Sequence, residues 1–168
     1  MLNHELEDKI QHYISEFMNI PEFSQGFKQT HHYNTTVSDH SIHVAIISAK
    51  TCYYLNKMGM HFAIDEVIRG SLLHDVGIVG ARKKKIKEMD GHCLAIYHPL
   101  KSVEIAENTL LDLTDREKNI IETHMFPLSQ HFPKYKESWV IVISDKVAFT
   151  KDMLGYREQI RTKLCKTI

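Results

Sequence analysis

Histidines and aspartates beside apolar runs are the residues of this sequence most suited to chemistry. Twelve of the 168 residues are histidine, and no tag-like tract accounts for them. The stretch SLLHDVG places His74 and Asp75 side by side where a helix would bury apolar side chains. Either this pair turns to water at a helix end, or it forms half of a metal site. The segments around the pair must decide between the two.

Apolar spacing divides the chain into segments of helical period. The stripe Leu6, Ile10, Tyr13, Ile14 and Phe17 predicts a helix over residues 3–18, which PEFSQG at 21–26 is expected to break. Further helices are expected over 40–58, from 65 to Gly77, from Pro99 to about 111, over 114–125, from about 138, and over 153–166. The basic segment 81–97 is predicted to be a loop with a short helical piece.

The expected architecture is all-α. The run TDRE at 114–117 has the form of a capping box, which supports a helix start there. VIVI at 140–143 could form a strand, but the SDKVAF that follows favours a buried helix. A length of 168 residues favours one domain with a real core. The sequence therefore predicts a bundle-like single domain over residues 1–168.

Polar residues at the ends of these helices, or on their apolar stripes, form a possible ligand set. Side chains at such positions in a bundle converge on a shared pocket. They are His40, His74, Asp75, His98, His124 and Asp145. A mixed nitrogen and oxygen set suits Fe, Mn, Co, Ni or Zn better than Ca or Mg. Two metals about 3.5–4 Å apart, sharing Asp75 and holding a hydroxide between them, would use all six ligands.

Five blocks in order resemble the HD-domain superfamily of metal-dependent phosphohydrolases. They are VSDHSIHVA, SLLHDVG, YHPLKSVEIAEN, IIETHMFPL and VISDKVAF, and together they span roughly residues 32–150, the expected metal-site core. The resemblance implies that the six residues named above are metal ligands. With His98 and His124 between the HD pair and Asp145, the ligand set resembles that of the binuclear branch of the superfamily, which includes symmetrical diadenosine tetraphosphate hydrolases.

Two departures from that family bear on the substrate. Many hydrolytic members carry a lysine three residues after the HD aspartate, where this chain has Ile78. Members acting on cyclic dinucleotides carry a Gly-Tyr-Pro signature, where this chain has HMFPL. The second departure argues against a cyclic-dinucleotide substrate.

Other side chains are candidates for substrate contact. Lys146, beside a ligand, is the candidate for phosphate binding or proton donation, and Asp75 is the candidate catalytic ligand. The basic run that begins at Arg82, Lys83 and Lys84 could replace the missing lysine, although a solvated loop is the alternative. His31 and His32 could reach the pocket mouth, with exposed loop histidines as the alternative, and His32 is assigned to the substrate. His43 is also assigned to the substrate, and the alternative is that it is an ordinary histidine on the helix surface.

Charge and cysteine usage exclude several classes of function. Lys and Arg number 21, as do Asp and Glu, so no global field attracts nucleic acid or an anionic membrane. The three cysteines are odd in number and form no C-x-x-C pair, which fits a reducing cytosol. The polar N-terminus has no signal-like region, and no apolar run approaches a bilayer span. The protein is expected to be cytoplasmic.

The leading hypothesis is hydrolysis of a phosphate ester or anhydride in a small molecule, with a nucleotide as the expected substrate. Two transition metals, iron first, would activate the water. One alternative is a di-iron oxygenase of the myo-inositol oxygenase type, which the same ligand order resembles. A second alternative is a metal-stabilised nucleotide sensor without turnover. The order of ligands alone does not separate these hypotheses.

Overall fold

The all-α prediction is confirmed by a computed structural model, which describes residues 4–154 apart from 33–34, 82–83, 111 and 130. The helices are α1 (His4–Phe17), α2 (Pro21–Gly26), α3 (Val37–Lys57), α4 (Ile64–Leu73), α5 (Leu94–Thr109), α6 (Asp115–Thr123) and α7 (Lys136–Met153). Two short 3-10 turns are η1 (Val76–Ile78) and η3 (Ile86–Met89). A small antiparallel pair consists of β1 (Thr30–His32) and β2 (Thr35–Thr36).

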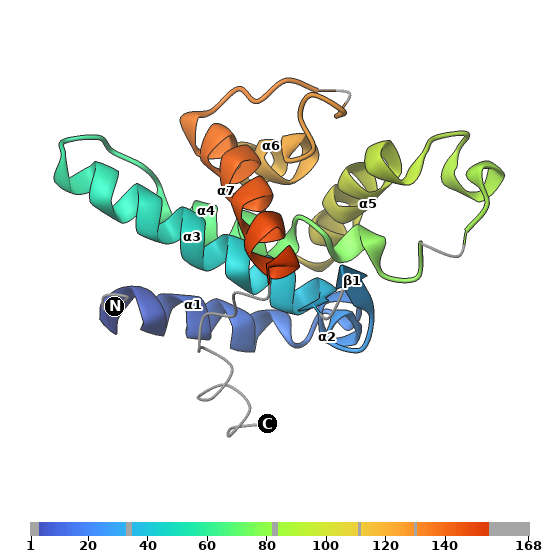
Figure 1. The fold of residues 1–168 in the computed structure, drawn as a ribbon, viewed down its shortest axis with the longest axis horizontal. Helices are drawn as coiled ribbons and strands as arrows, with labels where there is room; N and C mark the ends of the chain where they lie inside the picture. Colours follow the sequence, from blue (N-terminus) through green and yellow to red (C-terminus); the bar gives the residue numbers. More distant parts are fainter. Residues whose placement is uncertain (1–3, 33–34, 82–83, 111, 130, 155–168) are drawn as a thin grey trace.

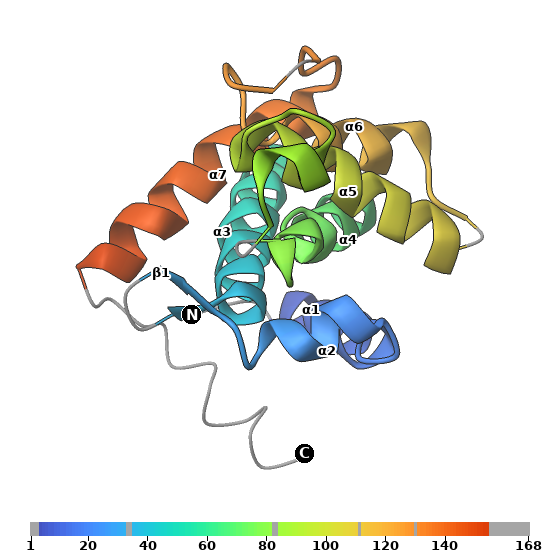
Figure 2. The ribbon, with the colours of Figure 1, turned by 90° about the vertical axis from the view of Figure 1, so that its right-hand side faces the viewer.

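Helix α3 lies at the centre of the molecule, with α4 packed along it (Figure 1). Helices α1 and α2 cover one side of this pair (Figure 2). Helices α6 and α7 pack on the other side, and α5 packs against α6 and η1 (Figure 2). Helices α3, α5, α6 and α7 therefore surround the end of α4 and the chain segment that follows it.

Helix α1 is held to the core by the stripe that the sequence predicted. Leu6, Ile10, Ile14 and Phe17 are all at most 3% exposed and belong to one cluster with residues of α3 and α4. Burial of each such side chain contributes about 1.5–3 kcal/mol to folding. The capping box predicted at Thr114 is also confirmed, because its side chain accepts from the Glu117 amide.

The break predicted at PEFSQG is confirmed, because α1 ends at Phe17. PEFSQG itself forms the separate helix α2, which Pro21 opens and which buries Phe23 against Phe17. One predicted boundary was wrong. Helix α5 begins at Leu94 rather than near Pro99, so that His98 and Pro99 lie in its second turn. Packing of α5 against α6 and η1 therefore outweighs the local cost of an interior proline.

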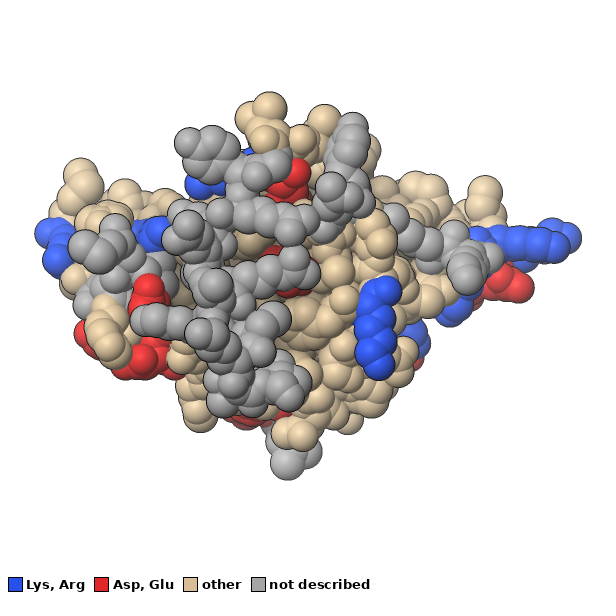
Figure 3. Space-filling model, turned by 60° about the horizontal axis from the view of Figure 1, so that its bottom comes forward, with Lys and Arg blue, Asp and Glu red and all other residues tan. Residues whose placement is uncertain are grey.

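The β1–β2 pair was not predicted, because strands of three and two residues are too short to show alternation. The helix expected over 153–166 extends beyond the described residues, which end at 154. Among the helices described, none combines the length and apolar character needed to cross a membrane. Figure 3 shows basic and acidic side chains scattered over one face rather than gathered into a stripe.

Candidate metal centre

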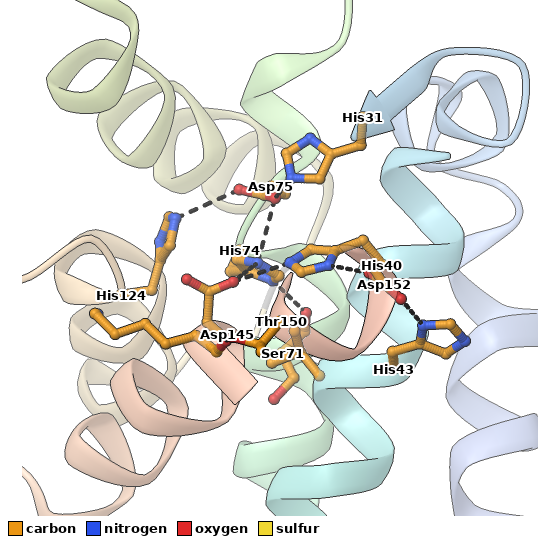
Figure 4. Close-up of polar contacts among 12 residues, drawn as sticks. His31, His40, His43, Ser71, His74, Asp75, His124, Asp145, Thr150 and Asp152 are labelled. Carbon is orange, nitrogen blue, oxygen red and sulfur yellow. Dashed lines mark hydrogen bonds and ion pairs between the residues drawn. The ribbon is translucent and has the colours of Figure 1, made fainter. Parts of the chain in front are cut away.

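The six predicted ligands converge on one buried region between the helices. Figure 4 labels five of them, and the sixth, His98, lies 3.2 Å from Asp75 Oδ1. They come from five helices or their ends: His40 from the first turn of α3, His74 and Asp75 from the end of α4, His98 from α5, His124 from the end of α6 and Asp145 from α7. Their side chains are 0–4% exposed, except that of Asp145 at 17%. Neighbouring His74 and Asp75 both point inward because α4 ends there and η1 follows.

Three of these imidazoles are fixed in the same way by the backbone. The Nδ1 atoms of His74, His98 and His124 each lie 2.7 Å from a carbonyl oxygen, of Ser71, Leu94 and Ile121 respectively. A carbonyl only accepts, so each Nδ1 carries the donated proton. Each Nε2 is then free to offer a lone pair, which is how a metal-binding histidine is commonly oriented.

The carboxylate of Asp75 lies at the centre of the cluster. Its Oδ1 is 3.2 Å from His98 Nε2 and 3.4 Å from His124 Nε2. Its Oδ2 is 3.3 Å from His31 Nε2 and 3.4 Å from His74 Nε2. The two oxygens of one side chain thus face two different pairs of histidines.

His40 has a different kind of support. Its Nε2 lies 2.9 Å from Asp145 Oδ1, and its Nδ1 lies 2.9 Å from Asp152 Oδ2. The other oxygen of Asp152 is 2.7 Å from Nδ1 of His43 (Figure 4). The Asp152 side chain is 0% exposed. A chain of contacts thus runs from His43 through Asp152 to His40, and the Asp152 carboxylate orients the His40 ring.

Two features of this geometry fit a bound cation. The Nε2 of His74 is buried, and among the described residues it has no hydrogen-bond partner. The Nε2 atoms of His98 and His124 are 2.9 Å apart although both Nδ1 atoms already donate. Two lone pairs at that distance repel unless a proton or a cation lies between them. A cation held by the lone pairs of both Nε2 atoms would remove this repulsion.

The charges of the site also require a cation or protons. Burial raises the pKa of Asp75, but the positive charge of His74 and the neighbouring imidazoles of His98 and His124 outweigh it and hold that pKa well below its usual value. Burial also raises the pKa of Asp145, yet the His40 contact lowers it to about 2. Conversely, burial disfavours charge on His40, but Asp145 and Asp152 raise its pKa to about 10. Buried carboxylates here stay ionised and need positive partners.

A cavity of about 510 Å³ opens beside the cluster. Its lining includes His31, Asp75, His98, His124 and Lys146. The Nζ of Lys146 donates to the carbonyl oxygens of Phe126 at 3.2 Å and Val142 at 3.1 Å. A small molecule in this cavity would therefore meet both the histidine cluster and one ammonium group.

Apart from Lys146, the residues predicted to contact substrate either lie outside the described residues or do not line the cavity. Arg82 and Lys83 lie outside the described residues, as does the side chain of His32. Lys84 donates to the Tyr97 hydroxyl at 3.2 Å and does not line the cavity. His43 does not line it either, because its ring contacts Asp152. Of these five positions, none that the structure describes reaches the cavity.

Two further residues lie in the cluster, and the sequence analysis named neither among its site residues. It preferred His32 over its neighbour, yet it is His31 that lies against Asp75, with its ring centroid 4.8 Å from that of His40. It also missed Asp152, for which a signal exists: Asp152 lies seven residues after Asp145 in α7, and so on the same helical face.

These findings define an all-α protein with a buried, mixed histidine and aspartate cluster suited to metal binding. The sequence model of the HD domain matches residues 37–161, and the chain belongs to this family. Members are generally metal-dependent hydrolases of small phosphorylated substrates. A conserved hypothetical protein from Pyrococcus furiosus has a similar fold, with a TM-score of 0.50 and 16% identity over 88% of this chain and 80% of that one. No curated protein matches the sequence.

Proposed function

We propose that this protein is a metal-dependent phosphohydrolase of a phosphate ester or anhydride in a small molecule, with a nucleotide as the class expected from the sequence. The observation that carries the proposal is the central carboxylate of Asp75, whose oxygens each face separate imidazole Nε2 atoms. Such a division suits two transition-metal ions, iron first and Mn, Co, Ni or Zn as alternatives. We propose residues 1–168 as one HD domain around this centre.

The residues that would hold the ions are His40, His74, Asp75, His98, His124 and Asp145. When bound, such ions supply Lewis acidity, which lowers the pKa of water and neutralises phosphoryl oxygens. The protein side chains provide the rest. Lys146, on the cavity wall, would turn its Nζ from the carbonyls of Phe126 and Val142 to a phosphoryl or leaving-group oxygen. The buried histidine cluster excludes bulk water from the reacting phosphorus.

The test compares wild-type protein with the Asp75→Ala variant in metal content and in anaerobic phosphate release from a panel of phosphoesters and nucleotides. We expect the variant to lose bound metal and turnover together, because both groups of histidines lose their shared carboxylate. Asp8→Ala, at a side chain 65% exposed on α1, is the matched control and should behave as wild type. Full turnover by metal-free Asp75→Ala would sink the proposal.

The same experiment separates the two alternatives. The oxygenase would be indicated if the iron-loaded protein consumes O₂ only when substrate is present and releases no phosphate when O₂ is absent. Binding of a nucleotide with no turnover over the whole panel would indicate the sensor.

A further inference from the structure

Six large apolar side chains belong to the lining of the cavity beside the histidine cluster. We call these residues the apolar wall: Ile78, Leu94, Met125, Phe126, Leu128 and Phe149. They come from η1, α5, the segment after α6, and α7, so elements far apart in sequence build one surface. Leu128 is 59% exposed and Phe149 is 36% exposed, although both are apolar. A ligand that covered them would remove apolar surface from water.

Positive charge is scarce on the same lining. Among the described residues that line the cavity, Lys146 is the one lysine or arginine, and its Nζ already contacts two carbonyl oxygens. Ile78 occupies the position three after Asp75 and lies in the wall. A second phosphoryl group placed beside Ile78 would lose water without gaining a cationic partner among the described lining residues, which is unfavourable. The cavity thus suits one anionic group at the histidine cluster and an uncharged body on the wall.

One residue of the wall, Phe126, packs against two further aromatic rings. The ring of Phe126 lies edge to face with those of Phe132 at 5.1 Å and Trp139 at 5.3 Å. Phe132 and Trp139 are themselves 5.5 Å apart. Such edge-to-face pairs hold aromatic rings in position. Trp139 is the single tryptophan of the chain, so its fluorescence reports on the wall.

We propose that the site takes a phosphate monoester whose alcohol part is an apolar alkyl or aryl group, with the phosphoryl group at the histidine cluster and the body on the apolar wall. This proposal rests on the phosphohydrolase activity of the proposed function, and it replaces the nucleotide expected from the sequence with a single phosphoryl group on an apolar body. In the reaction, the oxygen of water forms a new bond to phosphorus and the ester P–O bond breaks. The alcohol leaves with one proton, and inorganic phosphate takes the other.

The test uses phosphonates, whose C–P bond is not hydrolysed, with the full chain in the presence of Mn²⁺ and without oxygen. The probes are octylphosphonate, methylphosphonate and 8-phosphonooctanoate, which has a charged end on a chain of similar length. Binding is followed by Trp139 fluorescence and by calorimetry. We expect octylphosphonate to bind at least tenfold more tightly than either other probe, because each buried methylene adds about fourfold. Equal affinities, or tighter binding of the charged-tail probe, would overturn the proposal.

Two wall variants localise the effect. Leu128→Ser and Phe149→Ser should each weaken octylphosphonate at least fivefold and leave methylphosphonate unchanged. Ile143→Ser is the matched control, since Ile143 is an apolar residue of α7 that is 61% exposed and lies outside the wall. Melting temperatures establish that all three variants fold. An equal loss of octylphosphonate binding in the control would place the ligand elsewhere and contradict the proposal.

Phosphate release separates this proposal from the proposed function. Preference for octylphosphonate without phosphate release from any ester would support the apolar site and refute the hydrolase. Phosphate release from 1-naphthyl phosphate, adenosine monophosphate, adenosine triphosphate and glycerol phosphate at equal kcat/KM would support the hydrolase and refute the apolar preference.

Discussion

The Asp152 carboxylate orients the candidate metal ligand His40 without being one of the six candidate ligands itself. It contacts Nδ1 of His40 at 2.9 Å and Nδ1 of His43 at 2.7 Å. A carboxylate behind a histidine ligand fixes its ring and tautomer, and raises its basicity. His43, assigned to substrate on sequence grounds, instead contacts this carboxylate, and we interpret it as a positioning residue for His40.

Asp152→Ala is expected to lower metal affinity about tenfold to hundredfold, because the His40 ring loses the acceptor that orients it. Calorimetric titration with Mn²⁺ measures the effect. Asp152→Asn, whose amide oxygen still accepts one hydrogen bond, should lose less metal affinity than Asp152→Ala. His43→Ala keeps the contact between Asp152 and His40, so it should also lose less metal affinity than Asp152→Ala. Unchanged affinity in folded Asp152→Ala would contradict the positioning role.

At the scale of elements, Gly77 lets η1 lie directly against α5. A Cβ atom at this position would lie 2.3 Å from the His98 carbonyl oxygen and 2.7 Å from the Ser102 amide nitrogen. The Gly77 amide also donates to Ser102 Oγ at 2.9 Å. This close approach brings the end of α4, with Asp75, next to His98. Glycine is needed here for space.

Gly77→Ala should therefore lower the free energy of unfolding by about 1–3 kcal/mol, as overpacking against backbone atoms does. It should also weaken metal binding, because η1 and α5 must separate. Chemical denaturation and Mn²⁺ titration measure the two effects. Ser102→Ala is the control: it removes the hydrogen bond and leaves the space, so it should have the smaller effect on both. Wild-type metal affinity in Gly77→Ala would show that the spacing does not matter.

Helix α1 is fastened to α4 by a polar contact outside the metal centre. Lys9 Nζ lies 2.8 Å from Asp65 Oδ2, and the Tyr13 hydroxyl donates to Asp65 Oδ1 at 3.0 Å. Burial raises the pKa of Asp65, but these hydrogen bonds outweigh it and lower that pKa from 3.8. A carboxyl whose pKa is lower in the folded state than in the unfolded state stabilises the protein at pH values above its unfolded-state pKa. This stabilisation disappears as the pH falls through its folded-state pKa.

Asp65→Asn should therefore reduce the free energy of unfolding by about 0.5 kcal/mol at pH 7, a small value because the contact is half exposed. The difference from wild type should shrink as the pH is lowered below 3.8, the usual value for this carboxyl. Urea denaturation at pH 7 and at pH 3 measures it, with Asp8→Asn as an exposed control. A difference that stays constant with pH would rule out ionisation as the cause.

For the whole molecule, the six candidate ligands join five helices, so binding of metal and stability of the fold are coupled. A ligand that binds only the folded state, at one hundred times its dissociation constant, stabilises by about 2.7 kcal/mol. For a chain of this size, that corresponds to a rise of about 5–10 °C in Tm. Removal of metal by a chelator should lower Tm by this amount, and Mn²⁺ should restore it. Asp75→Ala should show no such response, and an equal response in that variant would place the metal elsewhere.

The sequence was sufficient for most of the helices and for naming the six candidate ligands that the structure brings together. The stripe of α1 and the capping box at Thr114 are local patterns, which act within a few residues and can be read directly. Histidines and aspartates at helix ends were recognisable because buried polar residues are unusual. The true start of α5 was not recognisable, since packing against α6 and η1 outweighs the local signal of Pro99.

Tertiary structure alone decided which neighbours of the cluster take part in it. His31 and His32 are adjacent in sequence, and the pairing of β1 with β2 directs His31 toward Asp75. Asp152 is 112 residues from the His40 that it orients, so no local pattern joins the two. The apolar wall likewise combines η1, α5 and α7. The sequence by itself determined which groups can bind a metal, because local chemistry sets that. The direction of each side chain, and the cavity between them, depended on contacts between distant elements.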